Sequence, residues 1–167
     1  MNKLTVPSKD KIVLITGCDS GFGRSLSTHL SCLGFHVISV CYTNKGASYL
    51  SDVADTIVAD LSTDVGIKKT VEFTKGVLIQ SKSSSQLWGI VNNAGMSHPG
   101  HLEWTDPLYY KKVMNLNYIA PVSLIHHLLS LLKKEHCKGR KHILENDGGG
   151  TKTNHERHFR LWIHICK

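Results

Sequence analysis

Hydrophobic positions in the first half of the chain form short runs that alternate with stretches of helical spacing. Lys11–Thr16 is a continuous apolar run typical of a buried strand, and Leu26, Leu30 and Leu33 then recur on one helical face. His36–Cys41 predicts a second strand of the same kind. The alternation continues with a helix over residues 47–54, a third strand over residues 56–59 and helical periodicity over Asp64–Gln80.

The second half begins with the same pattern and then loses it. Residues 87–91 predict an apolar strand, and Asp106 before Pro107 is typical of a helix N-cap followed by its first turn. We expect that helix to run to about Lys134, because its apolar residues keep helical spacing. These residues are Val113, Ala120, Leu124, Leu128 and Leu131. Residues 141–145 predict a fifth strand, before a flexible Asn-Asp-Gly-Gly-Gly run at 146–150.

Strands that alternate with helices indicate parallel pairing with right-handed crossovers. The sequence therefore predicts an α/β fold, a partial Rossmann-like doubly wound parallel sheet. We assign residues 1–146 to this domain and residues 147–167 to a basic, histidine-rich and irregular tail.

Composition and charge narrow the function. The chain has 167 residues, 41% of them hydrophobic, which suits one globular domain. Its net charge of +7 is concentrated at one end: residues 133–167 hold nine Lys and Arg against four Asp and Glu, a balance of +5. No apolar run approaches the roughly 20 residues of a membrane span, so we expect no transmembrane segment. The five cysteines show no paired spacing, which favours a reducing, cytoplasmic location.

Three glycines separate the first strand from the helix that follows it. Gly17, Gly21 and Gly23 follow the pattern TGxxxGxG, in which glycine permits a tight turn and a close approach of backbone N–H groups to a pyrophosphate. The alternative is a tight turn with no ligand. Their position directly after an apolar strand favours a dinucleotide site.

Polar residues also follow two later strands. Asp60 ends the third strand at the edge where ligands of open α/β sheets bind, although it could instead cap the next helix near Ser62. Asn92 and Asn93 end the strand over residues 87–91, where their amides could join neighbouring loops. Ala94 and Gly95 leave space for a ribose, and the alternative for this segment is a plain turn.

Asn117 lies on the apolar stripe of the long helix, where a buried amide needs hydrogen-bond partners. Pro121 has no N–H for the carbonyl of Asn117 four residues earlier, so we expect a kink with a carbonyl able to hold a water. The alternative is a kinked core helix in which the asparagine is merely satisfied.

TGCDSGFG, the strand-ending Asp60, LWGIVNNAG and VMNLNYIAP together resemble the short-chain dehydrogenase/reductase family, and most of all its retinol and hydroxysteroid dehydrogenase branch. The resemblance covers about residues 11–140. It implies an NAD(P)-dependent oxidoreductase that interconverts lipophilic alcohols with ketones or aldehydes, and whose relatives are often associated with the endoplasmic reticulum. The implied cofactor-binding residues are Gly17, Ser20, Gly21, Phe22 and Gly23 at the pyrophosphate and ribose, Asp60 and Leu61 at the adenine, and Asn93, Ala94 and Gly95 along the cofactor. Asn117 matches the catalytic asparagine, whose main-chain carbonyl holds a relay water.

The family completes its site with a serine and a Tyr-x-x-x-Lys motif, and the chain departs from that pattern. Residues 141–146 replace the expected Ser-Ser strand, and no tyrosine follows Tyr118. We therefore expect this chain to be inactive or weakly active. The alternative is a non-catalytic cofactor-binding or interaction form, acting as a homo-oligomer or paired with full-length relatives.

The end of the second strand leaves the cofactor open between NAD and NADP. It offers no acid for a ribose 2′-hydroxyl and a single cation, Lys45, which could contact a 2′-phosphate or be solvated. Relatives in the resembled branch often favour NAD. In the tail, His155, His158, His164 and Cys166 are too irregularly spaced to predict a metal site, and we expect neither metal nor nucleic acid to bind there.

Overall fold

Four parallel strands form the central sheet of the protein, in the order β3-β2-β1-β4. The computed structural model describes residues 10–97 and 100–144, with side chains as far as Lys133. The strands are β1 (Lys11–Thr16), β2 (His36–Cys41), β3 (Asp55–Val58) and β4 (Gln86–Val91). Because β1 pairs with both β2 and β4, its carboxyl end lies between the ends of two other strands.

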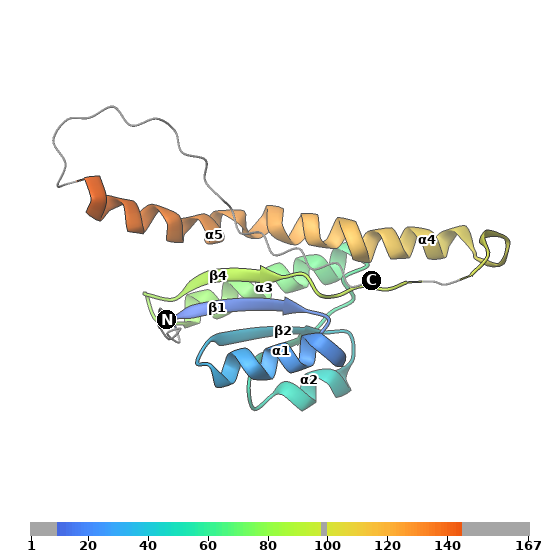
Figure 1. Ribbon diagram of the computed structural model, residues 1–167, viewed down its shortest axis with the longest axis horizontal. Helices are drawn as coiled ribbons and strands as arrows, with labels where there is room; N and C mark the ends of the chain where they lie inside the picture. The colour runs from blue at the N-terminus through green and yellow to red at the C-terminus, as the bar shows by residue number, and fades with distance from the viewer. Residues whose placement is uncertain (1–9, 98–99, 145–167) are drawn as a thin grey trace, which may run out of the picture.

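Helices cover both faces of this sheet (Figure 1). On one face lie α1 (Gly21–Cys32) and α2 (Asn44–Leu50), and on the other lie α3 (Asp64–Gln80) and α5 (Ala120–Leu144). A short 3-10 helix, η1 (Leu102–Trp104), precedes α4 (Pro107–Met114), and a π-helical segment, η2 (Asn115–Ile119), joins α4 to α5. The doubly wound parallel arrangement expected from the alternating pattern is confirmed.

Two apolar layers hold the helices to the sheet. On the α3 and α5 side, Ile12, Leu14 and Leu87 pack with Leu124 and Leu128. On the α1 and α2 side, alternate strand residues such as Val13 and Ile15 form the second layer. Residues of β1 thus point into both layers, as expected for a strand buried on both faces.

The end of α1 fixes how β2 enters the sheet. Gly34 has a φ of +91° and directly follows Leu33, the C-cap of α1. The N–H of Gly34 donates to the carbonyl of Ser31, and the N–H of Phe35 donates to that of Leu30, which is a Schellman motif.

The long helix departs from α-helical geometry where Pro121 interrupts the hydrogen-bond pattern. Asp106 is its N-cap, as predicted, and accepts a hydrogen bond from the N–H of Leu108 at 2.8 Å. In η2 the N–H of Ala120 donates to the carbonyl of Asn115, a five-residue spacing. The irregularity expected at Pro121 is therefore a π-helical turn.

Several predicted elements need correction. The second helix covers Asn44–Leu50 instead of residues 47–54, because Thr43 caps it by accepting from the N–H of Gly46 at 3.1 Å. The third strand begins and ends one residue earlier than predicted. Residues 141–144 belong to α5 and not to a fifth strand. A helix satisfies its own backbone hydrogen bonds, whereas a strand needs a neighbouring strand to do so.

Within the described residues, none of the helices combines the length and apolar character required to cross a membrane.

Candidate functional site

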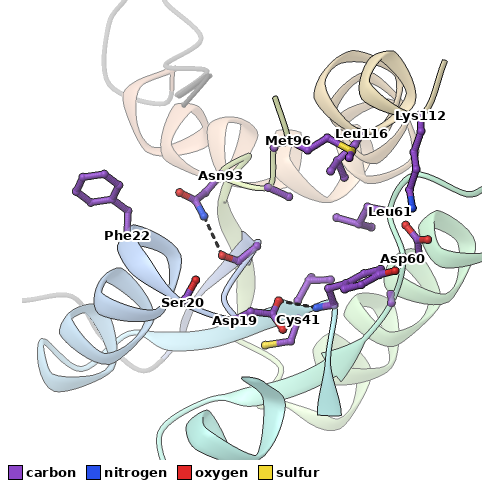
Figure 2. A pocket seen from close by; sticks show the side chains of 16 residues that line it. Asp19, Ser20, Phe22, Cys41, Asp60, Leu61, Asn93, Met96, Lys112 and Leu116 are labelled. Atoms are coloured by element: carbon purple, nitrogen blue, oxygen red, sulfur yellow. Dashed lines mark hydrogen bonds between the residues drawn. The ribbon is translucent and has the colours of Figure 1, made fainter. Parts of the chain in front are cut away.

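A cavity of about 470 Å³ opens at the carboxyl ends of the strands. Its walls come from the loops after β1, β2, β3 and β4 and from one side of α4 and η2 (Figure 2). This edge is where open α/β sheets bind their ligands, because the loops diverge there to either side of the sheet.

The glycine loop after β1 forms one wall of the cavity. Gly17 and Gly21 have φ angles of +71° and +56°, which other residues rarely adopt. A Cβ at Gly23 would lie 2.2 Å from the carbonyl oxygen of Gly17, so only glycine lets α1 start so close to the strand. Ser20 is the N-cap of α1, and the first N–H groups of the helix face the ligand side with the positive end of its dipole.

Thr16 joins the ends of β1 and β4. Its hydroxyl accepts from the N–H groups of Asn93 at 3.0 Å and Ala94 at 2.9 Å. The side-chain amide of Asn93 donates to the carbonyls of Thr16 and Gly17, each at 3.0 Å. The prediction that these amides connect neighbouring loops is confirmed for Asn93, which holds the glycine loop against the end of β4.

Asn92 points into the protein, and its role differs from that of Asn93. Its side chain is 5% exposed, and its Oδ1 has no hydrogen-bond partner among the described residues.

Asp60 lines the cavity beyond β3, beside Leu61. Its Oδ1 accepts from the N–H and the hydroxyl of Ser62 at 2.9 and 2.6 Å, which forms a local turn. Thr63, and not Asp60, caps α3 by accepting from the N–H of Gly66 at 3.1 Å. The alternative that Asp60 is the helix cap is therefore wrong.

Asn117 lies behind the cavity wall rather than on it. Its Oδ1 accepts from the N–H of Met96 at 2.9 Å, and its Nδ2 donates to the carbonyl of Met96 at 2.8 Å. Met96 itself lines the cavity. The amide on the apolar stripe is thus satisfied, and it positions the segment that follows Gly95.

Asp19 lines the cavity but is not among the site residues expected from the sequence. Its Oδ2 accepts from the N–H of Tyr42 at 2.6 Å, and its Oδ1 accepts from the N–H and the hydroxyl of Thr43 at 2.8 and 2.7 Å. Burial raises the pKa of the Asp19 carboxyl, but these hydrogen bonds outweigh burial and hold the pKa below its ordinary value. Asp19 is therefore an anion that fastens the glycine loop to the end of β2.

Cys41 forms part of the cavity floor, with Cys18 nearby. Burial, followed by the neighbouring Cys18 and Asp19, raises the pKa of the Cys41 thiol to about 12. Burial also raises the pKa of Cys18. Both thiols are protonated at neutral pH, so they act as small apolar groups and not as nucleophiles.

The cavity gathers most of the residues implied by the family resemblance. These are Gly17, Ser20, Phe22, Asp60, Leu61, Asn93, Ala94 and Gly95, whereas Gly21 and Gly23 lie in the first turn of α1. The ring of Phe22 points away from the cavity (Figure 2). Sequence reasoning missed Asp19, Met96, Lys112 and Leu116; only the position of Asp19 within the glycine motif was a signal for any of them.

The cavity residues fit a nicotinamide dinucleotide. A Cβ at Gly17 would lie 2.7 Å from the Cα of Ala94, so the two loops meet as closely as their backbones allow. The charged residues on the cavity wall are Asp19, Asp60 and Lys112. Within the described residues no cluster of His, Cys, Asp or Glu could hold a metal, and the tail residues from His155 to Cys166 lie outside that range.

A doubly wound sheet with a glycine loop, a helix N-terminus and a cavity at its carboxyl edge defines a dinucleotide-binding protein of the Rossmann type. The family model described as short chain dehydrogenase matches residues 11–140. The chain belongs to the short-chain dehydrogenase/reductase family.

Its relatives include hydroxysteroid and retinol dehydrogenases. The chain is 36% identical over 137 residues to 17-beta-hydroxysteroid dehydrogenase type 6 of Mus musculus, which covers 79% of this chain and 41% of the relative. It is 35% identical over 137 residues to retinol dehydrogenase 7 of Rattus norvegicus, with the same two coverages. The chain therefore spans about two fifths of the length of these relatives.

Solved structures show the same fold. The 3-ketoacyl-(acyl-carrier-protein) reductase of Brucella melitensis, complexed with NADH, superposes with a TM-score of 0.68 at 26% identity, over 77% of this chain and 53% of that one. The RhlG/NADP active-site complex of Pseudomonas aeruginosa gives a TM-score of 0.63 at 29% identity, over 74% and 48%.

Proposed function

We propose that this chain supplies the nicotinamide-dinucleotide site of a short-chain oxidoreductase. The observation that carries the proposal is the packing of the glycine loop against the start of α1 and the end of β4, on the wall of the 470 Å³ cavity. The pyrophosphate lies at the N-terminus of α1, where free N–H groups and the helix dipole stabilise an anion. Asp60 and Leu61 flank the adenine, and Asn93, Ala94 and Gly95 lie along the rest of the cofactor.

The reaction that we propose is hydride transfer between the nicotinamide and a lipophilic alcohol or carbonyl compound. The names of the hydroxysteroid and retinol dehydrogenase relatives support this substrate class. When bound, the cofactor supplies the hydride or accepts it. The chain itself binds and orients the cofactor, and the Asn93 and Asn117 amides keep two segments of the wall in place.

The structure limits what Asn117 can contribute. Both functional groups of its side-chain amide are engaged by Met96, so any contact with a relay water falls to its main-chain carbonyl. Pro121 offers that carbonyl no N–H, which supports this role. Because no Tyr-x-x-x-Lys follows Asn117 in the sequence, we expect the 167-residue chain to bind the cofactor without appreciable turnover.

Isothermal titration of the 167-residue chain with NAD⁺, NADH, NADP⁺ and NADPH tests the binding proposal. Saturable binding of at least one of these, lost in Gly23→Ala, is the expected result. Circular dichroism must first show that the chain is folded. A folded chain that binds none of the four dinucleotides contradicts the proposal. Alcohol-dependent formation of NADH by the same chain would contradict the expected lack of turnover.

We further propose that the chain associates with a second copy or with a longer relative through α4, η2 and α5. Met114, Tyr118, Ile119 and Val122 are large apolar side chains exposed along this long helix. Tyr118 and Val122 lie on the side opposite to Ala120 and Leu124, which pack on the sheet. Sedimentation velocity should show a dimer that Tyr118→Glu and Val122→Glu weaken, and a monomeric wild type would contradict association with a second copy.

The cysteines support a reducing compartment, and we propose the cytoplasm. Cys18, Cys32 and Cys41 are free thiols, and two of them are buried in the core near the cavity.

A further inference from the structure

The β1–α1 loop places a carboxylate at the end of β2, although β2 and its following loop contain no acid. Asp19 lies two residues after Gly17, and its oxygens contact the N–H groups of Tyr42 and Thr43 at 2.6 and 2.8 Å. Tyr42 is the first residue after β2. Figure 2 shows Asp19 at the cavity with its hydrogen bond to that segment.

The end of β2 is where a Rossmann fold distinguishes its two cofactors. An acid there binds the 2′-hydroxyl of the adenosine ribose in NAD, whereas an arginine accommodates the 2′-phosphate of NADP. We propose that Asp19 takes the place of the β2 acid and makes the site selective for NAD(H) over NADP(H). This inference rests on the proposed function and names the cofactor that the function leaves open.

The hydrogen-bond capacity of Asp19 supports the proposal. An ionised carboxylate offers about four acceptor directions and no donor. Donors of Tyr42 and Thr43 occupy three of these directions in the structure. Of the two oxygens, Oδ1 accepts both donors of Thr43 and Oδ2 accepts only the N–H of Tyr42 among these bonds, so Oδ2 is the oxygen to which a ribose hydroxyl would donate. A 2′-phosphate has only acceptor oxygens at neutral pH and would face the anion without a hydrogen bond.

Among the described residues, the cations near Asp19 do not offset the repulsion between its carboxylate and a 2′-phosphate. The guanidinium of Arg24 donates to the backbone carbonyl of Asp19 and lies over the ring of Tyr49, with 4.3 Å from Cζ to the centroid. Lys45 is exposed on α2 and does not line the cavity. Lys112 reaches the cavity from α4 on the side where Asp60 lies (Figure 2).

Asp19 also has a structural role, because it connects two loops, and the test must separate the two roles. A loss of loop order would lower the affinity for all nucleotides by the same factor. A loss of charge selectivity would change the ratio of affinities for nucleotides with and without the 2′-phosphate. The ratio is therefore the decisive quantity, and Asp19→Ser and Asp19→Asn are the variants to compare.

The experiment titrates the 167-residue chain with NAD⁺, NADP⁺ and two fragments, 5′-AMP and adenosine 2′,5′-bisphosphate. The wild type is expected to prefer the nucleotide without the 2′-phosphate by about tenfold or more, because the carboxylate of Asp19 repels a phosphate placed beside it. Asp19→Ser and Asp19→Asn should reduce that preference by about the same factor. Asp64→Asn removes an exposed charge in the first turn of α3, away from the cavity wall, and should leave the preference unchanged.

Each result has a distinct meaning. Equal wild-type affinity for 5′-AMP and the bisphosphate overturns the role of Asp19 even if neither Asp19 variant folds. A preference that survives in both Asp19 variants, with all affinities lowered equally, shows that Asp19 is structural only. A folded wild type that binds none of the four nucleotides instead overturns the proposed function itself.

Discussion

The side-chain amide of Asn117 bonds to both backbone polar groups of Met96, at 2.9 Å to its N–H and 2.8 Å to its carbonyl. The side chain of Asn117 thus satisfies the N–H and the carbonyl of Met96, as the backbone of a neighbouring strand would. A Cβ at Gly95 would lie 3.5 Å from Oδ1 of Asn117, so the two segments are in close contact. Asn117 therefore supports the cavity wall at Met96 without lining the cavity itself.

Asn117→Leu should lower the free energy of unfolding by about 1–3 kcal/mol, because it leaves the N–H and carbonyl of Met96 without their partner. Urea denaturation measures the change, and cofactor titration should show weaker binding. Asn115→Leu is the matched control within the same π-helical segment, since Asn115 makes one longer hydrogen bond, 3.2 Å to the carbonyl of Ser62. An effect as large for Asn115→Leu as for Asn117→Leu would contradict the bracing role.

Gly23→Ala should disrupt the glycine loop, because its Cβ would lie 2.2 Å from the carbonyl oxygen of Gly17 and 2.6 Å from Nδ2 of Asn93. We expect a loss of about 1–3 kcal/mol in stability, typical of overpacking, together with a loss of cofactor binding. Gly76→Ala in α3 is the control, since a Cβ there has no neighbour within 4 Å. That substitution should raise stability by about 0.5–1 kcal/mol. Thermal melts that show the two variants to be equally stable would refute the packing argument.

Thr16→Val keeps the shape of a side chain that is 2% exposed but removes the hydroxyl that joins β1 to the segment after β4. The N–H of Ala94 loses its acceptor, whereas the N–H of Asn93 keeps the carbonyl of Val91 at 3.1 Å. One part-buried donor without its partner should lower the free energy of unfolding by about 1 kcal/mol.

Thr28→Val provides the comparison for Thr16→Val. The hydroxyl of Thr28 donates only to the carbonyl of Arg24 within α1, so its removal should change stability by less than about 0.5 kcal/mol. Chemical denaturation that ranks Thr28→Val as the more damaging change would show that the Thr16 link is unimportant.

The exposed thiol of Cys32 should react faster than the buried thiols of Cys18 and Cys41. With a pKa raised to about 12, Cys41 holds almost no thiolate at pH 7–9, whereas Cys32 is exposed on α1. Iodoacetamide should therefore modify Cys32 well before Cys41 or Cys18, and raising the pH from 7 to 9 should leave Cys41 protected. Peptide mapping by mass spectrometry measures the order. Early labelling of Cys41 in the folded chain would contradict the burial of the cavity floor.

Local patterns were sufficient for much of the fold. The apolar runs of β1 and β2 indicate strands buried on both faces, and the Asp106-Pro107 pair marks the start of the long helix, because these signals depend on neighbouring residues alone. Gly34 marks the end of α1 for the same reason: its φ of +91° is a property of one residue. Residues 141–144 show the limit, since strand and helix there differ only in whether a neighbouring strand is present.

The sequence by itself determined the parallel α/β class, the glycine loop and the family, because each is encoded in short-range spacing. The tertiary structure decided which residues meet across that framework. Asp19 reaches the end of β2 from 23 residues away, and Asn117 reaches Met96 from 21 residues away. Hydrogen bonds of this kind depend on strand order and loop path, which no local pattern specifies, and they define the wall of the site.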